Sequence, residues 1–124
     1  MNHEKRPPLI LEVSWGRMTA DGLGTGKGFK LYPGGGHEWD WAETRTRHVP
    51  GIQPADAEEL LAHGATAVVL SQGMESRLQV DPATYEYLDQ QSVTVDTAQT
   101  SEAVKVYNEP AEDVLVAGLF HPTC

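Results

Sequence analysis

Continuous apolar runs mark two strands in the second half of the chain. Residues 65–70 (ATAVVL) and 114–120 (VLVAGLF) are apolar throughout, which is typical of strands that are covered on both faces. A shorter strand is expected over residues 93–96. Because helical patterns separate these strands, we predict a parallel sheet with right-handed crossovers.

Three helices are indicated by their start and stop residues. Pro54 opens the first helix, which has acidic residues in its first turn and ends at Gly64. Asp81, followed by a proline, caps the second helix. Thr100 or a neighbouring residue caps the third, and Pro110 is expected to end it.

The first third of the chain has a different pattern, which predicts antiparallel strands. Residues 9–13 indicate a strand, Gly16 a turn or bulge, and residues 18–32 a hairpin with a glycine-rich loop. The predicted fold class is α/β, with this β-hairpin region beside a βαβαβ core and a mixed sheet. At 124 residues the chain is long enough for one domain, which we place at residues 9–124 after a disordered lead-in at residues 1–8.

Composition excludes several classes of partner. A net charge of −9 and a pI near 4.8 repel phosphate backbones and anionic lipids, so we expect neither nucleic-acid nor membrane binding. No run approaches the ~20 apolar residues of a membrane span. The single cysteine, Cys124, cannot form an internal disulfide and fits a reducing compartment, so we expect the cytoplasm.

The stretch over residues 31–56 has no helical period, and we predict a long functional loop there. In an extended chain the rings of Trp39 and Trp41 point to the same side, where they either pack in the core or form a wall for a ligand. Core packing is the favoured interpretation. The residues of this stretch that we expect to face a ligand or partner are Pro33, Gly34, Gly35, Trp39, Trp41, Arg45, Arg47 and His48.

The densest positive cluster of this acidic chain consists of Arg45, Arg47 and His48. The two guanidinium groups could bind a carboxylate or phosphate, or they could pair internally with Glu43 or Asp40. The sequence supports both interpretations equally.

The carboxyl ends of the predicted parallel strands are Ser71-Gln72-Gly73, Asp96-Thr97 and His121. Ligands collect outside the carboxyl ends of parallel strands, so Gln72, Gly73 and His121 are candidate contacts for a small polar ligand. The same residues would serve equally well as plain connections. The site also requires a parallel last strand, because an antiparallel strand would place His121 at the opposite edge.

The final residues place His121 three positions before Cys124. Cys124 could act as a thiolate nucleophile with His121 or His48 as its base. However, Pro122 prevents a helix that would align them, and packing of the tail against the sheet is favoured. One cysteine and five histidines without CxxC or HExxH spacing argue against a zinc site, and we expect no metal or other cofactor.

Several short motifs, each weak alone, together resemble a known family. They are Pro33-Gly34-Gly35, Trp39-Asp40-Trp41, Glu43-Thr44, His48, Pro50 to Asp56, Gly73-Met74, Leu78, Tyr87-Leu88, Ala103-Val104, Tyr107-Asn108, Phe120-His121 and Thr123-Cys124. From about Leu9 to Cys124 the chain resembles the adipogenesis-associated Mth domain-containing protein family, of which a mitochondrial complex I assembly factor is a more distant cousin. Residues 22–28 depart from that family's pattern.

The resemblance implies a single Mth-type domain with β-hairpins beside a three-layer α/β core. It implies a regulatory or assembly role through partners and supplies no enzyme activity. We therefore expect a cytoplasmic, non-catalytic binding, regulatory or assembly module that acts through a protein partner or a small ligand. The alternative is a small hydrolase or thiol-dependent transferase that uses His48 or His121 with Cys124, and a structural metal protein ranks third. The scattered charge permits either a monomer or a dimer.

Overall fold

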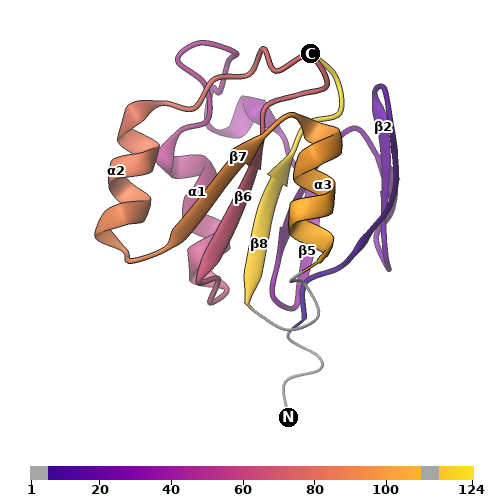
Figure 1. Cartoon of the computed structure of the whole chain (residues 1–124), viewed down its shortest axis with the longest axis horizontal. Coiled ribbons are helices and arrows are strands. Elements are labelled where there is room, and N and C mark those ends of the chain that lie inside the picture. Colours follow the sequence, from indigo (N-terminus) through magenta and orange to yellow (C-terminus); the bar gives the residue numbers. More distant parts are fainter. Residues whose placement is uncertain (1–5, 110–114) are drawn as a thin grey trace.

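The computed structural model describes residues 6–109 and 115–124, and within them it contains two sheets and three α-helices (Figure 1). In chain order the elements are β1 (Ile10–Ser14), β2 (Arg17–Ala20), β3 (Gly24–Gly26), β4 (Phe29–Tyr32), β5 (Gly35–Glu38), the 3-10 helix η2 (Trp41–Glu43), α1 (Pro54–Ala62), β6 (Ala67–Ser71), α2 (Pro82–Gln90), β7 (Thr94–Ala98), α3 (Thr100–Asn108) and β8 (Val116–Phe120).

The larger sheet is mixed and has the strand order β5-β4-β8-β6-β7. The central strand β6 pairs in parallel with β7 and β8, whereas β4 runs antiparallel to both β8 and β5. The α/β class with a mixed sheet is therefore confirmed, as is the parallel direction of the last strand. The strands β1, β2 and β3 form a separate antiparallel sheet.

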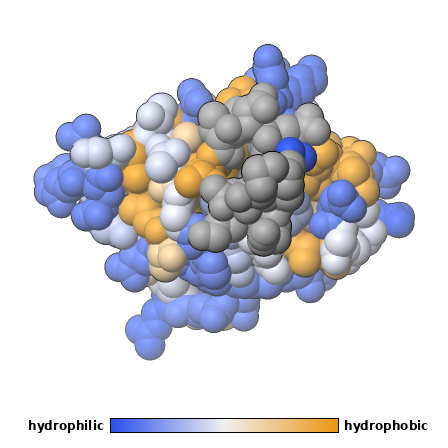
Figure 2. Space-filling model, turned by 90° about the horizontal axis from the view of Figure 1, so that it is seen from below, coloured by the Kyte–Doolittle hydropathy of each residue, from blue (hydrophilic) through white to orange (hydrophobic). Residues whose placement is uncertain are grey.

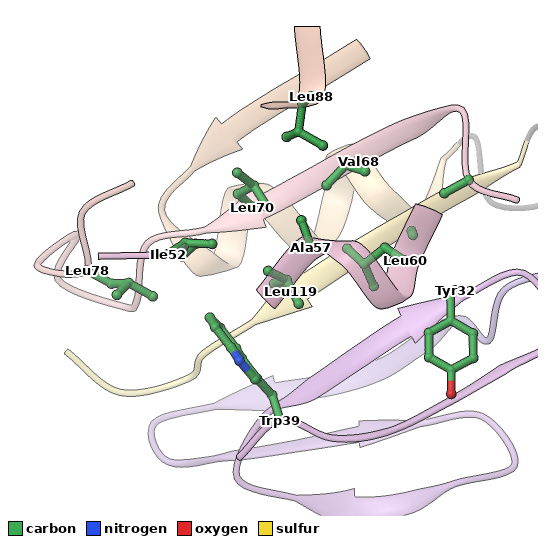
Figure 3. Packing of buried hydrophobic residues seen from close by; sticks show 12 residues of the cluster. Tyr32, Trp39, Ile52, Ala57, Leu60, Val68, Leu70, Leu78, Leu88 and Leu119 are labelled. Atoms are coloured by element: carbon green, nitrogen blue, oxygen red, sulfur yellow. The ribbon is translucent and has the colours of Figure 1, made fainter. Parts of the chain in front are cut away.

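The larger sheet separates two hydrophobic cores. Val68 and Leu70 belong to the first core, with Leu60 of α1 and Leu88 of α2, whereas Val69 belongs to the second core, which includes residues of α3 and the small sheet. Figure 3 shows the first core, in which α1 packs against β6 and β8. Strands that bury alternate residues in two cores must be apolar at every position, which explains the continuous apolar runs. The molecule therefore has three layers: α1 and α2, the larger sheet, and α3 with the small sheet.

The helices begin close to the predicted positions. The Asp81 side chain caps α2 by accepting a backbone N–H of its first turn at 3.0 Å. The cap of α3 is Gln99, one residue before Thr100, and its side-chain oxygen accepts a backbone N–H at 3.3 Å. Pro110, predicted to end α3, lies outside the described residues.

The stretch over residues 31–56 is less irregular than predicted, because Gly35–Glu38 forms the edge strand β5. Its two glycines have low strand propensity, but the backbone pairing with β4 supplies the strand regardless of side chain. The predicted hairpin over residues 18–32 is also divided. Residues 17–26 form the β2–β3 hairpin, and β4 joins the larger sheet.

Of the predicted lead-in at residues 1–8, the described residues 6–8 make contacts with distant parts of the chain. The Arg6 carbonyl accepts the N–H of Gly34 at 3.2 Å, and the Pro8 carbonyl accepts the hydroxyl of Tyr107 at 2.5 Å. Residues 1–5 lie outside the described residues. The sequence offered no signal for these contacts because both partners are far away along the chain.

Across residues 6–109 and 115–124, no helix combines the length and the apolar character needed to cross a membrane. Figure 2 views the lower end of the molecule, where hydrophobic and hydrophilic side chains are intermixed.

Candidate functional site

Residues 39–53 connect β5 to α1 through a loop that two anchors hold in place, and we call it the clamped loop. The first anchor is a backbone contact with Gln79. The N–H of Ile52 donates to the Gln79 carbonyl at 2.9 Å, and the N–H of Gln79 donates to the His48 carbonyl at 2.9 Å. Gly51 has φ +102°, and a Cβ there would lie 2.0 Å from the Gln79 carbonyl oxygen. Only glycine permits so close an approach of the two chain segments.

The second anchor is the carboxylate of Asp56, which is fully buried. Its Oδ1 accepts hydrogen bonds from the indole N–H of Trp39 at 3.2 Å and from the hydroxyl of Thr44 at 2.6 Å. Its Oδ2 accepts the hydroxyl of Thr46 at 2.5 Å and the backbone N–H of Gln53 at 2.8 Å. A buried polar network with every member satisfied rigidifies the chain around it. The loop is therefore ordered before anything binds to it.

The clamped loop meets the end of β8 in a group of three rings, Trp41, His48 and His121, which we call the ring cluster. The Trp41 ring centroid lies 5.1 Å from that of His48 and 4.5 Å from that of His121, and the two imidazoles are 5.9 Å apart. Trp39 lies 5.6 Å from Trp41 and points into the first core beside Leu119 (Figure 3). The clamped loop thus brings His48 to His121, which is distant in sequence.

Trp39 and Trp41 do not share one extended strand, because Trp41 starts η2, and the two indole planes are inclined by 57°. Both rings nevertheless pack against the first core. Trp39 is buried, as the core interpretation expected, whereas Trp41 remains partly exposed.

The two imidazoles of the ring cluster are in different electrostatic states. Burial, and secondarily the charge of His48, lower the pKa of His121 to about 4, so His121 is neutral at neutral pH. Its Nε2 lies 2.9 Å from the hydroxyl of Thr123. The buried Nε2 of His48 has no hydrogen-bond partner among the described residues. Such an unpaired group is costly, and its presence marks the cluster as a candidate binding surface.

Arg45 and Arg47 are exposed on the clamped loop. Within the described part of the chain, neither guanidinium forms an ion pair with Glu43 or Asp40. The carboxylate of Asp40 instead caps η2 by accepting the N–H of Ala42 at 2.9 Å. The described residues therefore show no internal pairing of this cluster with Glu43 or Asp40. Both guanidinium groups face solvent from a fixed backbone.

Pro33, Gly34 and Gly35 lie away from the ring cluster. Because β4 runs antiparallel to β8, the turn after β4 is at the opposite end of the sheet from His121. Gly34 and Gly35 line a cavity of about 540 Å³ there, together with Arg6 and other residues. The residues of this stretch that were expected to face a ligand therefore lie at two different ends of the sheet.

The residues after β6 lie at the same sheet edge as His121. The backbone N–H of His121 donates to the hydroxyl of Ser71, the last residue of β6, at 2.8 Å. Gly73, however, is buried under the C-terminal tail, and a Cβ on it would lie 2.3 Å from the backbone of Cys124. The tail therefore occupies the space that a ligand would need at Gly73. The backbone of Gln72 is bonded at both its N–H and its carbonyl, in an ordinary connection to α2.

Cys124 is partly buried, and the tail around it is held by backbone contacts. The Cys124 carbonyl accepts the N–H of Arg77 at 2.9 Å. Among the described hydrogen bonds, none joins the Cys124 thiol to His48 or His121. In addition, no group of three or more histidine, cysteine, aspartate or glutamate residues in the described chain is placed to hold a metal ion.

Sequence reasoning missed two sets of residues that the structure assembles. One is the Asp56 network, where Asp56 had been interpreted only as an acidic residue in a helix's first turn. The spacing of Gln53 and Asp56 before an apolar run matches a capping box, and the structure contains that box. The other set includes Lys30 and Glu59. The sequence signal for this pair is a lysine within an otherwise apolar strand, because a buried lysine requires an acidic partner.

The comparisons with known proteins identify the family. The model of a family described as a protein of unknown function (DUF498/DUF598) matches residues 10–121. The chain belongs to this family. The match covers both sheets, the clamped loop and the ring cluster.

Solved structures show the same fold. A conserved hypothetical protein from Pyrococcus horikoshii OT3 is 22% identical over 93% of this chain and 98% of its own, with a TM-score of 0.78. A protein named as an outer membrane protein of Bartonella henselae is 19% identical over 98% of this chain and 100% of its own, with a TM-score of 0.76. At these identities the likeness shows the fold alone.

Proposed function

We propose that the protein is a non-catalytic binding module that recognises carboxylate groups of a ligand or protein partner at the clamped loop. The observation that carries this proposal is the pair Arg45 and Arg47, two exposed cations on an anchored loop that no acidic neighbour in the described chain neutralises. Guanidinium groups bind carboxylates through paired hydrogen bonds, and a fixed backbone reduces the entropy lost on binding.

The surroundings of the two arginines support an amphipathic ligand. Val49, on the same loop, is 71% exposed, and the partly exposed ring of Trp41 contacts His48, the residue before Val49. The chain as a whole carries a charge of −9, so the arginines form a local exception in an acidic surface. An acidic segment with an apolar side chain would satisfy both features. Such an interaction would be selective, because the rest of the surface repels an anion.

The test uses two probes that carry the same chemistry, citrate and a short glutamate-rich peptide. Binding would be followed by backbone amide and indole chemical shifts at low ionic strength. We expect shifts at Arg45, Arg47 and the Trp41 indole. The double variant R45Q/R47Q should weaken binding by about tenfold or more, since it removes both charged contacts. Raising the salt concentration from about 50 to about 200 mM should weaken it further.

The matched control is R17Q/K105Q, which removes the same charge from exposed positions on β2 and α3. If the control weakens binding as much as R45Q/R47Q does, the attraction is general and the proposed site is wrong. Binding of both probes, or of either one, supports the site; the peptide alone would indicate a partner segment and citrate alone a small ligand. Failure of both probes to bind would overturn the proposal.

The thiol-dependent alternative has less support, because His121 bonds to Thr123 and no described hydrogen bond activates Cys124. A regulatory or assembly role of the Mth type, in the cytoplasm, would fit a module that recognises an acidic partner segment. The regulatory or assembly role and the cytoplasmic location are part of the proposal, and the peptide experiment tests the interaction with a partner.

A further inference from the structure

Three charged side chains meet between the edge strand β5 and helix α1. Lys30 on β4 and His37 on β5 are direct cross-strand partners, and both reach Glu59 on α1. The Oε2 atom of Glu59 lies 2.7 Å from Nε2 of His37, and its Oε1 lies 3.6 Å from Nζ of Lys30. The Lys30 side chain is only 7% exposed, against 42% for His37 and 34% for Glu59. Two cations therefore share one carboxylate in a partly buried place.

The contacts of His37 fit the imidazolium form, which carries a proton on each ring nitrogen. Its Nδ1 lies 2.8 Å from the backbone carbonyl of Glu38, and its Nε2 lies 2.7 Å from the Glu59 carboxylate. A carbonyl and a carboxylate both accept hydrogen bonds, so both ring nitrogens must donate, and only the imidazolium can do so. A neutral ring would have to give up one of the two contacts.

The surrounding charges agree with this protonation state. Burial alone would lower the pKa of His37, but the hydrogen bonds to Glu38 and Glu59 outweigh both burial and the charge of Lys30 and raise it. Burial would raise the pKa of Glu59, yet its contacts with His37 and Lys30 lower it. The neighbouring Tyr32 has a raised pKa, because of its burial and then because of Glu59, so it remains neutral.

His63 completes this environment, since its ring stacks on Tyr32 with centroids 3.9 Å apart and planes inclined by 9°. The Tyr32 and His37 rings in turn meet edge-on, with centroids 6.1 Å apart. The charged groups facing His37 from β4, β5 and α1 are thus Lys30 and Glu59.

Beyond its backbone pairing with β4, strand β5 has few side-chain contacts. It is a four-residue edge strand, and two of its residues are the glycines Gly35 and Gly36. Of its two side chains beyond Cβ, Glu38 accepts the N–H of Lys27 at 3.2 Å in an exposed contact, while His37 reaches α1. Edge strands with so little side-chain packing open at low free-energy cost. The bond between His37 and Glu59 therefore joins this strand to the helix layer.

We propose that His37, Glu59 and Lys30 form a proton-controlled latch, which holds β5 against α1 while His37 is protonated and loosens when the imidazole loses its proton. The raised pKa of His37 determines the direction in which the latch responds to pH. The stabilisation is complete below the unfolded-state value of about 6.5 and is lost as pH rises through the higher folded-state pKa. Because β5 ends at Glu38 and the clamped loop begins at Trp39, the latch controls how firmly the first residue of that loop is held.

The test compares the wild-type protein with E59Q and with E58Q, a matched control on the exposed side of α1. The pKa of His37 would be measured by NMR titration from about pH 5 to about pH 9, the range in which histidines titrate. Hydrogen-exchange protection of the β5 amides, corrected for intrinsic rates, would be measured over the same range. The other edge strand, β7, serves as the internal reference.

We expect the wild-type His37 pKa to lie above 6.5. In E59Q it should fall below the wild-type value, while E58Q should leave it nearly unchanged. Protection of β5 should decrease by about tenfold more than that of β7 as pH rises, and this difference should disappear in E59Q. A wild-type His37 pKa at or below 6.5, or equal pH dependence of β5 and β7, would overturn the proposal. Both of these measurements use the wild-type protein, so the test stands even if E59Q does not fold.

Discussion

Replacement of Asp56 by asparagine tests whether the buried carboxylate holds the clamped loop or merely caps a helix. Each carboxylate oxygen accepts one hydroxyl, which can rotate, and one fixed N–H, from Trp39 on Oδ1 and from Gln53 on Oδ2. An asparagine has only one acceptor oxygen. Whichever way its amide is oriented, one fixed N–H faces an NH₂ group, and no rotation of a hydroxyl relieves that contact.

The expected cost follows from these contacts. A hydrogen bond to a charged group contributes about 1.5–3 kcal/mol, and leaving a buried donor unsatisfied costs about 1–3 kcal/mol. We therefore expect D56N to lower the free energy of unfolding by about 2–4 kcal/mol, a large part of the ~5–15 kcal/mol typical of a domain. Loss of a helix cap alone would cost only about 1 kcal/mol.

Urea denaturation followed by tryptophan fluorescence measures this difference. The control is D89N, the same change at an exposed position on α2, which should alter the free energy of unfolding by less than about 0.5 kcal/mol. A loss below about 1 kcal/mol in D56N would refute the reasoning, because it would mean that the four donors find other partners.

Three further outcomes are expected. The His121 imidazole should titrate with a midpoint near 4 in an NMR pH titration, and a midpoint near 6.5 would contradict the described burial. Because the pKa of His121 is lowered, the stability that this group contributes is complete above about pH 6.5 and is lost as pH falls towards 4. G51A should lower the free energy of unfolding by about 3 kcal/mol or more in denaturant unfolding, because its Cβ would clash with the Gln79 carbonyl. The control G64A, at a glycine with φ +91° and open space around it, should cost only about 1 kcal/mol. Equal costs would show that the chain relaxes to avoid the clash at Gly51. Y107F should cost about 1–2 kcal/mol in the same assay through the buried hydroxyl's lost bond to the N-terminal segment, and an unchanged stability would indicate that this segment is not held there.

The elements predictable from the sequence are those whose signals are local. Pro54 and Gly64 mark α1 because each acts through its own backbone angles. The run over residues 65–70 predicts β6 because a central strand must be apolar on both faces. The antiparallel N-terminal region followed in the same way from glycine turns.

The failures concern contacts between segments that are far apart. β5 was missed because its glycines carry no strand propensity, and its pairing depends on β4 alone. Of the candidate site, the presence of Arg45, Arg47 and His48 in an exposed loop was predictable, but the meeting of His48 with His121 was not. The local sequence does not specify which part of the sheet edge the clamped loop contacts. Gly51 and Asp56 position this loop through partners that are distant in sequence.

The division of the molecule by its larger sheet has a consequence for how the protein can diverge. Trp39, Ile52, Ala57 and Leu60 all belong to the core on one side of that sheet, and the clamped loop and the latch rest on them. The other side carries the small sheet and its glycine-rich hairpin tip, at which Gly22 and Gly24 have open space around them. A side chain at Gly22 or Gly24 would strain the backbone, because both residues have positive φ, but insertions at that tip can accumulate with little effect on recognition. The fold thus separates a constrained half from a tolerant half, and new specificities can arise in one without the loss of the other.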